Sequence, residues 1–214
     1  LHEQGYSTHH IGKWHVGEAD EYPQTWPLKQ GFHDWFGMYN HFRLRGPEPD
    51  GSWVRKPGTH INPWLHDNDM PERQYTGHLD DLLTDRAVSV INKATPKKPW
   101  FINLWLYSPH HPFEPSETFR KQFPDTEAGQ YLALLSQLDS NVARLTQALK
   151  STGQSDNTIV IFTSDNGGFN IGRDNNWPLA GTKNTYLEGG VRTPLLIRYP
   201  HKSNQHDVYA STHI

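Results

Sequence analysis

Apolar runs that alternate with amphipathic segments constrain the fold of this chain more than any other feature. Residues 100–107 and 158–163 are almost entirely apolar, and 194–199 form a third run of this kind. Unbroken apolar runs of this length are typical of strands covered on both faces. Residues 75–93 and 128–150 precede the first two runs and repeat apolar side chains at the period of a helix. Strands that alternate with helices predict an α/β protein of three layers (α/β/α), with a mostly parallel sheet between helices.

Each predicted helix has one apolar face and a recognisable end. Pro96 and Pro99 close the first helix, and Gly153 follows the second as a helix-capping glycine would. A short strand is predicted over residues 8–11, with Gly12 as its end. The apolar faces comprise Leu79, Leu82, Leu83, Ala87, Val90 and Ile91 in the first helix, and Leu132, Leu135, Leu138, Val142, Leu145 and Leu149 in the second.

Residues 17–72 are predicted to form a long excursion without a regular period. The segment is rich in Pro, Gly and Trp and is anchored by the sequence GFHDWFG at 31–37. A loop of this length inside a compact domain usually has a functional reason. We therefore expect this segment to line the substrate side of a cleft.

Composition excludes several kinds of protein. The 214 residues suit one domain or the larger part of one, and 8 Trp, 9 Tyr and 9 Phe supply apolar area for a core despite a mean hydropathy of −0.80. A net charge of −3 without a basic cluster argues against a nucleic-acid partner. No apolar run approaches the roughly 20 residues that a membrane-spanning helix needs. With 0 Cys, thiolate metal sites and a cysteine nucleophile are excluded within these residues, and the 14 His show no zinc-ligand spacing.

Three polar clusters follow the ends of predicted strands. They contain, in chain order, Lys13 with His15, then His110, then Asp165 with Asn166. Ligands of open α/β sheets bind beyond the carboxyl ends of the strands, so these clusters are expected to converge at one edge. Asp165 and Asn166 offer only oxygen ligands, which favour calcium or magnesium over zinc or copper. Asp-Asn-Gly is also ordinary turn chemistry, and the expected convergence favours the metal site.

The lysines and histidines of these clusters suit an oxyanion. Lys13 and Lys183 each lie beside a glycine-containing turn, and if they converge they would stabilise a dianion such as sulfate or phosphate. The alternative is a pair of solvated lysines. His15 and His110 would transfer protons near neutral pH. The alternative for each is a structural histidine bonded to a backbone carbonyl.

Other polar residues are predicted to be architectural. In the sequence EGGVR at 188–192, the paired glycines permit close approach of the backbone. Glu188 and Arg192 would brace the loop that carries Lys183. His9 and His111 are assigned structural roles.

On these residues the chain resembles the type I sulfatases of the alkaline-phosphatase-like superfamily. GYSTHHIGKWHVG at 5–17 is similar to the second sulfatase signature, and PLKQGFHDWFG at 27–37 follows it as in that family. PHHP at 109–112, DNTIVIFTSDNGG at 156–168, and Lys183 with EGGVR at 188–192 then come in the family's order. The resemblance extends over nearly the whole chain. It implies an alkaline-phosphatase-like core, here a partial catalytic domain over residues 1–214.

The resemblance implies a role for each candidate residue. Asp165 and Asn166 would be two ligands of a calcium ion, with magnesium the less favoured cation. Lys13 and Lys183 would bind the sulfate oxygens. His110 would protonate the leaving alcohol, and His15 would contact the nucleophile and assist the release of sulfate. These roles describe a sulfuric ester hydrolase.

One part of the family's pattern is absent. The nucleophile of these sulfatases is a formylglycine made from Cys or Ser in a Cys/Ser-x-Pro-x-Arg motif, and no such motif occurs in the 214 residues. We expect it upstream, together with aspartates that complete the metal site. The family's smaller C-terminal subdomain is also missing. The sequence is therefore interpreted as an internal fragment, incomplete at both ends and inactive by itself.

Two other functions remain open at this point. A phosphoesterase or phosphonate hydrolase of the same superfamily would bind a similar dianion, and the fold alone does not separate the two. A non-catalytic module that binds sulfated glycans would use the tryptophans of the excursion to stack on sugar rings. The competing interpretation of those tryptophans is that they pack the long segment. The tryptophans concerned are Trp26, Trp35, Trp53 and Trp64.

The substrate and the location are family-level expectations. The polar and aromatic stretch at 39–72 favours a sulfated carbohydrate over a small aryl sulfate. No nucleic-acid or membrane partner is implied, and the family is periplasmic or secreted. Further sulfates or carboxylates could contact His41, Arg43, Arg45 and His60, and the alternative is that most of these side chains are only solvated.

Overall fold

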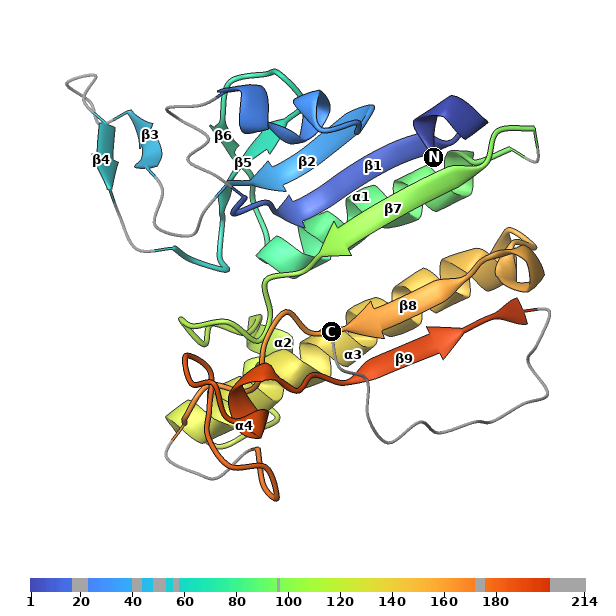
Figure 1. Cartoon of the computed structure of the whole chain (residues 1–214). Coiled ribbons are helices and arrows are strands. Elements are labelled where there is room, and N and C mark those ends of the chain that lie inside the picture. The colour runs from blue at the N-terminus through green and yellow to red at the C-terminus, as the bar shows by residue number, and fades with distance from the viewer. Residues whose placement is uncertain are drawn as a thin grey trace. The chain divides into compact units, whose positions relative to one another are not determined.

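The computed structural model describes residues 1–16, 23–39, 44–47, 53–55, 58–95, 97–171 and 176–200, with only the backbone at 23, 44–47 and 53–55. The chain divides into two compact units, Leu1–Ala148 and Leu149–Ile214, each with a sheet of its own. From α1 onward helices and strands alternate along the chain (Figure 1), which confirms the α/β class.

The first unit is built on a five-stranded sheet with the order β6-β5-β2-β1-β7. Strand β1 runs parallel to both of its neighbours, β2 and β7, and this part of the sheet confirms the predicted parallel arrangement. Strands β5 and β6 extend the sheet in antiparallel fashion, and β3 with β4 forms a separate two-stranded sheet. The strands are β1 Ser7–Lys13, β2 Asp34–Met38, β3 Leu44–Pro47, β4 Trp53–Arg55, β5 Trp64–Asp67, β6 Arg73–Gln74 and β7 Trp100–Trp105.

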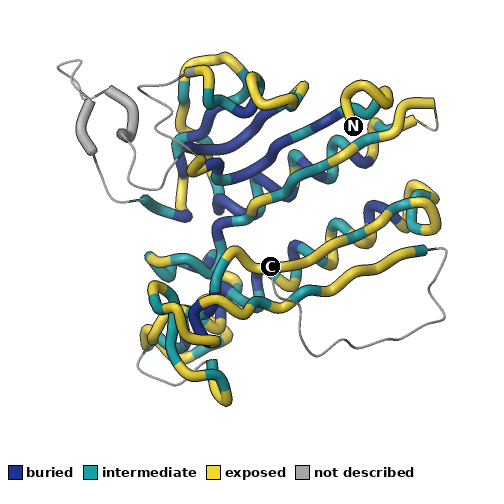
Figure 2. The backbone as a smooth tube through the Cα atoms, viewed as in Figure 1, coloured by how far each residue is buried: buried dark blue, intermediate teal, exposed yellow. Residues whose placement is uncertain are grey.

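Helix α1 (Leu79–Lys93) packs on one face of this sheet and forms the main core with it. Figure 2 shows the buried residues gathered in β1, β2 and the turns of α1. The helix begins at Leu79 and not at the predicted residue 75, because Gly77 has φ 128° and His78 pairs with Ile61 in a β-bridge. Burial of each leucine in this core stabilises the fold by about 1.5–3 kcal/mol. The core comprises Ile11, Phe36, Met38, Leu65, Leu79, Leu83, Ala87 and Tyr107.

An aromatic cluster covers the opposite face of β2. Side chains alternate along a strand, so Trp35 and Tyr39 face away from Phe36 and Met38. Trp35 is fully buried and packs with Trp26 from the segment of short 3₁₀ turns at Pro23–Thr25 and Pro27–Lys29. These aromatic side chains therefore pack the long segment, as the competing interpretation of them proposed.

The predicted excursion over 17–72 contains strands that the sequence pattern did not indicate. Residues 34–38 form β2, which pairs with β1 from His9↔Asp34 to Lys13↔Met38, and β3, β4 and β5 lie in the same segment. The prediction that Gly12 ends the first strand is wrong, since β1 continues through it to Lys13. A side chain at Gly12 would overlap the carbonyl oxygen of Trp105, and φ is 118° there. Glycine is needed for close approach of the strands and not for a turn.

The buried face of helix α3 (Glu127–Ser151) differs from the predicted one. Leu132 was placed in the apolar face but is 47% exposed. Gln137 and Asn141 are buried instead, and each donates a hydrogen bond of 2.9 Å to the Asp81 carboxylate of α1. Leu149 is buried and Leu145 packs against the main core, so the leucine period predicts the buried face of α3 only in part. The short helix α2 (Glu117–Arg120) precedes α3.

The second unit pairs β8 (Val160–Thr163) with β9 (Leu195–Arg198) in antiparallel fashion. In the described residues between them, 164–171 and 176–194, the structure has one helical turn, α4 (Glu188–Val191), and no long crossover helix of the kind that joins a parallel pair. The prediction of strands covered on both faces is not met, since Ile161 is 62% exposed in β8 and Phe101 is 38% exposed in β7. A 3₁₀ turn at Ser155–Asn157 links α3 to β8.

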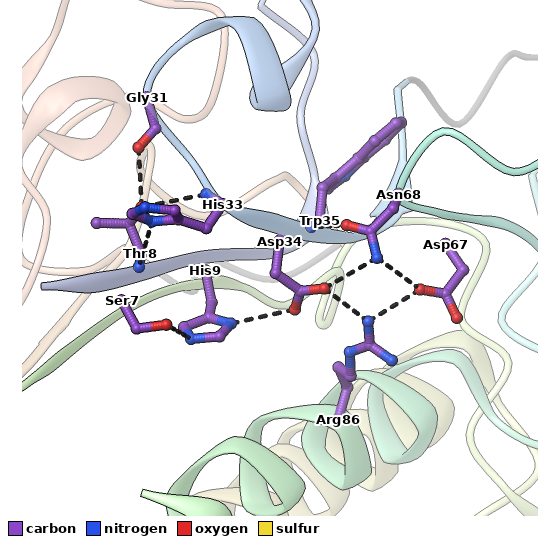
Figure 3. Close-up of polar contacts among 10 residues, drawn as sticks. All are labelled: Ser7, Thr8, His9, Gly31, His33, Asp34, Trp35, Asp67, Asn68 and Arg86. Atoms are coloured by element: carbon purple, nitrogen blue, oxygen red, sulfur yellow. Dashed lines mark hydrogen bonds and ion pairs between the residues drawn. The ribbon is translucent and has the colours of Figure 1, made fainter. Parts of the chain in front are cut away.

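A polar network joins α1 to the amino end of the parallel strands (Figure 3). Arg86 donates to Asp34 Oδ1 at 2.8 Å and to Asp67 Oδ1 at 2.9 Å, and Asn68 bridges the same two carboxylates. His9 Nδ1 contacts Asp34 Oδ2 at 3.1 Å. Burial by itself would raise the pKa of Asp34, but the hydrogen bonds from His9 and Arg86 hold it well below its ordinary value. The structural role predicted for His9 is thus confirmed.

Candidate active site

Two of the predicted polar clusters meet at the carboxyl edge of the sheet. Lys13 is the last residue of β1, and His110 follows β7, the strand that pairs with β1 up to Gly12↔Trp105. The parallel pairing brings the ends of both strands to the same edge. The predicted convergence of these two clusters is confirmed within the first unit.

The ring of Tyr107 lies beside both candidate residues. Lys13 Nζ is 5.7 Å from its centroid, and the His110 imidazole stacks on it at 4.8 Å with an interplanar angle of 29°. The ring is 4% exposed, and burial raises the pKa of Tyr107, with added contributions from the charges of Asp80 and Glu114. Tyr107 is therefore a neutral phenol and donates to the His111 carbonyl at 3.3 Å. The Tyr107 ring thus contacts both the Lys13 ammonium group and the His110 imidazole. An ammonium group and an imidazole held this close together are suited to binding an anionic substrate.

His15 lies just beyond the same edge. Its φ is 42°, and its N–H donates to the Tyr39 carbonyl at 2.6 Å, which continues the β1–β2 pairing past the end of β1. Trp14, between Lys13 and His15, is buried, stacks on Trp105 and donates its indole N–H to the Thr25 carbonyl at 2.8 Å. The buried indole fixes the backbone that carries the two polar residues.

A buried polar cluster that the motifs did not reveal lies beneath His110. Asp80, in the first turn of α1, accepts from the N–H groups of Tyr107 at 2.8 Å and Ser108 at 2.9 Å. His60 Nε2 bonds to the His110 carbonyl at 3.0 Å, and its backbone N–H donates to Glu114 at 2.9 Å. Only the placement of Asp80 beside the buried Leu79 hinted at this in the sequence. His60 had no local signal.

One expectation from the sequence changes here. His60 was assigned to contacts with further sulfates, yet it is fully buried, and burial lowers its pKa. It is therefore a neutral internal histidine. His41, Arg43 and the side chain of Arg45 were given the same role and lie outside the described residues, as does the side chain of Trp53.

The second unit holds the other candidate residues in one glycine-packed loop region. Gly167 N–H donates to the Gly190 carbonyl at 3.0 Å, and Lys183 N–H donates to the Gly168 carbonyl at 3.0 Å. A side chain at Gly167 would overlap the Gly189 carbonyl, and one at Gly189 would overlap the Gly181 carbonyl. These contacts tie the loop after β8, with Asp165 and Asn166, to the loop that carries Lys183. The architectural role predicted for residues 188–192 is confirmed.

Glu188 and Arg192 form an exposed ion pair of 3.5 Å within α4. Their distance matches the predicted bracing contact, but an exposed pair of this kind contributes only about 0.3–0.5 kcal/mol. The glycine contacts, and not this pair, hold the loop.

Asp165 and Asn166 have the chemistry of hard-cation ligands. Among the described residues Asp165 takes part in no hydrogen bond or ion pair. Asn166 Nδ2 donates to the Gly167 carbonyl at 2.8 Å, so its Oδ1 is the atom suited to a cation. Two oxygen ligands fit calcium but are fewer than the 6–8 that it takes. Within the described ranges no cluster of three or more His, Asp or Glu side chains completes such a set.

The fold and this geometry define an α/β protein with cationic and imidazole groups at the carboxyl edge of its sheet, placed for an oxyanion. Comparison with known proteins identifies the family. The family model described as Sulfatase matches residues 1–214, and the chain therefore belongs to the sulfatase family. Its fold is the alkaline-phosphatase-like α/β fold of the solved sulfatases.

Individual relatives agree with this assignment. The chain is 32% identical to arylsulfatase J of Mus musculus over 96% of its own length, and 31% identical to N-acetylgalactosamine-6-sulfatase of Homo sapiens over 94%. It covers 34% and 38% of those proteins, so it spans little more than a third of their length. The crystal structure of Ps i-CgsB in complex with k-i-k-neocarrahexaose aligns with a TM-score of 0.79 at 30% identity, covering 93% of this chain and 46% of that one. No helix in the described ranges is long and apolar enough to cross a bilayer.

Proposed function

We propose that this protein hydrolyses sulfate esters of a carbohydrate. The observation that carries the proposal is the pairing of Lys13 and His110 across the Tyr107 ring, at the carboxyl edge of a sheet of the sulfatase family. Lys13 and Lys183 bind the sulfate oxygens, and His110 protonates the leaving alcohol. His15 assists sulfate release.

Two groups that the family implies complete the proposed site. Asp165 and Asn166 would hold a calcium ion, which supplies positive charge against the sulfate when bound. A formylglycine would supply the nucleophile, and since the 214 residues contain 0 Cys and no suitable Ser motif, it would come from outside them. Residues 1–214 by themselves are proposed to be inactive. Periplasmic or secreted location belongs to the same proposal.

A carbohydrate substrate is supported by the relatives. One is named for N-acetylgalactosamine-6-sulfate, and the solved structure of another contains neocarrahexaose. The sugar and the position of its sulfate are not specified by these similarities. The test therefore uses a panel of sulfated mono- and oligosaccharides.

The decisive experiment assays the complete natural gene product for sulfate release. Wild-type protein should release sulfate from at least one sugar sulfate, and Lys183→Ala should reduce kcat/KM at least about 100-fold, as expected for loss of a group that stabilises a transition-state charge. Lys121→Ala is the matched control, because Lys121 is exposed and pairs only with Glu117. Preferred release of phosphate from phosphate esters would contradict the proposal. Sulfate release by purified residues 1–214 that Lys183→Ala abolishes would contradict only the proposed inactivity of these residues by themselves.

The metal part is tested separately by calorimetry. Calcium should bind the complete protein after chelator treatment, and Asp165→Ala should weaken binding at least about tenfold. Asp125→Ala, at a side chain that is 80% exposed, is the control. Equal calcium affinity in both variants would remove Asp165 from the proposed site.

A further inference from the structure

His110 lies on a loop whose first residues are held by one buried carboxylate. Asp80 is fully buried, and its two oxygens accept separately from the consecutive N–H groups of Tyr107 and Ser108. A carboxylate that accepts two backbone N–H groups fixes the direction in which the chain leaves β7. His110 N–H then donates to the Tyr107 carbonyl at 2.9 Å, so the constraint reaches His110 within one turn.

A buried histidine holds the other side of the same residue. His60 Nε2 lies 3.0 Å from the His110 carbonyl, and a carbonyl only accepts, so Nε2 carries the proton and donates it. The His60 ring also packs on Tyr107 at 4.9 Å. Glu114 accepts from the His60 backbone N–H and from Thr59 Oγ1 at 2.6 Å, which fixes the position of His60 itself.

The His110 ring is oriented in the same way. Its Nδ1 lies 2.6 Å from the His111 carbonyl and must donate to it. Proton transfer to a substrate therefore falls to Nε2, the ring nitrogen on the far side of the imidazole, and because Nδ1 keeps its own proton the donating form is the doubly protonated imidazolium. Stacking on Tyr107 at 4.8 Å sets the plane of the ring. A second residue that fixes ring orientation and tautomer is typical of catalytic histidines.

We propose that His60 and Asp80 are positioning residues for His110, which they hold through its own carbonyl and the two preceding backbone amides so that Nε2 faces the leaving alcohol. The inference rests on the proposed function of His110 as the proton donor. It adds that the position of the His110 ring is set by two buried side chains, His60 and Asp80, that do not contact the substrate. Displacement of the loop by a fraction of an ångström slows proton transfer while sulfate binding persists.

The test compares two substrates that differ in their need for a proton. The alcohol of a sugar sulfate is a poor leaving group and needs the donor, whereas nitrophenolate leaves without one. In the complete protein His60→Leu should lower kcat for the sugar sulfate by about tenfold or more, and for nitrophenyl sulfate by less than about threefold, with KM within about twofold for both. His60→Gln keeps an N–H donor and should restore the sugar-sulfate kcat to within about threefold of wild type.

His78→Leu is the matched control. His78 is also buried and packs beside His60 at 5.2 Å, but it bonds to the Glu114 carbonyl and not to His110. A purely structural effect should change both substrates by the same factor, as expected for His78→Leu. If His60→Leu does not fold, Asp80→Asn, which keeps the side-chain shape and loses one acceptor, should show the same substrate-selective loss.

Each outcome decides a different claim. Equal losses for the two substrates in His60→Leu, or in Asp80→Asn where the first variant does not fold, would overturn the positioning roles and leave the proposed function intact. Sulfate release from neither substrate by the wild-type protein would overturn the proposed function, and the positioning roles with it. Selective loss with rescue by His60→Gln supports both.

Discussion

The two ends of the parallel strands hold polar side chains in different ways. At the amino end Arg86, Asp34 and Asp67 bond to one another, with Asn68 and His9 completing the set (Figure 3). At the carboxyl end His60 and Asp80 bond to the backbone of a loop. Helix α1 contributes to both ends, through Asp80 in its first turn and Arg86 further along.

Unmet hydrogen bonds do not separate the two ends. In the described part of the chain, buried polar atoms without a partner include His60 Nδ1, His78 Nδ1 and Ser108 Oγ near the carboxyl end, and also Trp35 Nε1 beside Asp34. An unpaired buried polar group costs about 1–3 kcal/mol. The difference between the two ends therefore lies in the partners of their buried charges, which are side chains at the amino end and loop backbone at the carboxyl end.

The largest effect should come from His110 itself. His110→Ala should lower kcat for a sugar sulfate by about 10²–10⁴-fold because the proton donor is lost, with a smaller loss for nitrophenyl sulfate. The midpoint of urea unfolding should change little, since the ring is half-buried and its carbonyl contact to His60 is unchanged. A large fall in that midpoint would make His110 a structural residue and remove the contrast between the two ends.

Acid should destabilise the sheet through His10, which lies between the two ends. Burial lowers the pKa of His10 to about 4, against about 6.5 when unfolded. Because the unfolded state binds a proton at His10 more readily than the folded state does, the contribution of neutral His10 to stability is fully present above about pH 6.5. This contribution falls as the pH drops toward about 4. Wild type should lose up to about 3 kcal/mol over this interval relative to His10→Gln. Parallel pH profiles of the two proteins in urea denaturation would contradict this.

Asp34→Asn should show that the amino end is structural. Removal of one charge leaves Arg86 with a single carboxylate in a half-buried network, and the free energy of unfolding should fall by about 1–3 kcal/mol. Because the pKa of Asp34 is lower in the folded than in the unfolded state, ionised Asp34 stabilises the fold above about pH 3.9, its unfolded pKa, and this contribution is lost as the pH falls further. The Asp34→Asn variant should lack this acid-dependent contribution. kcat at pH 7 should be unchanged; a fall in kcat without unfolding would contradict the assignment.

The smallest effect should come from Glu188→Gln in the second unit. The Glu188–Arg192 pair is exposed, so the free energy of unfolding should change by less than about 0.5 kcal/mol, and 1 M salt should abolish the difference. Chemical denaturation with and without salt measures both. If Glu188→Gln lowered the free energy of unfolding as much as Asp34→Asn, burial would not explain the difference in strength between the two sets of ion pairs.

Much of the fold and half of the first-unit site followed from local patterns. The runs at 100–107 and 158–163 predicted β7 and β8, and the helical periods predicted α1 and α3. The rule that ligands bind beyond strand ends placed Lys13 and His110 at one edge, and the structure confirms it. Strand β2 was missed because it has only five residues, one of them Gly37, and such a short segment shows no clear period.

Two further errors share one cause. Part of the face of α3 was misassigned because Gln137 and Asn141 are buried against Asp81, a residue 56 and 60 positions away. His60 was assigned to the surface because its partner, the His110 carbonyl, lies 50 positions away. Burial of a polar group depends on a distant partner, and no local pattern reports it.

The sequence by itself determined which segments become strands and helices, and which reactive residues follow the strand ends, because both depend on side-chain period and on short motifs. Only the tertiary structure decided that β2 lies beside β1, that Asp80 grips the loop after β7, and that His60 supports His110. The physical reason is that apolar burial is a property of each residue and its neighbours in the chain. A satisfied buried polar group is a property of two segments that meet only on folding.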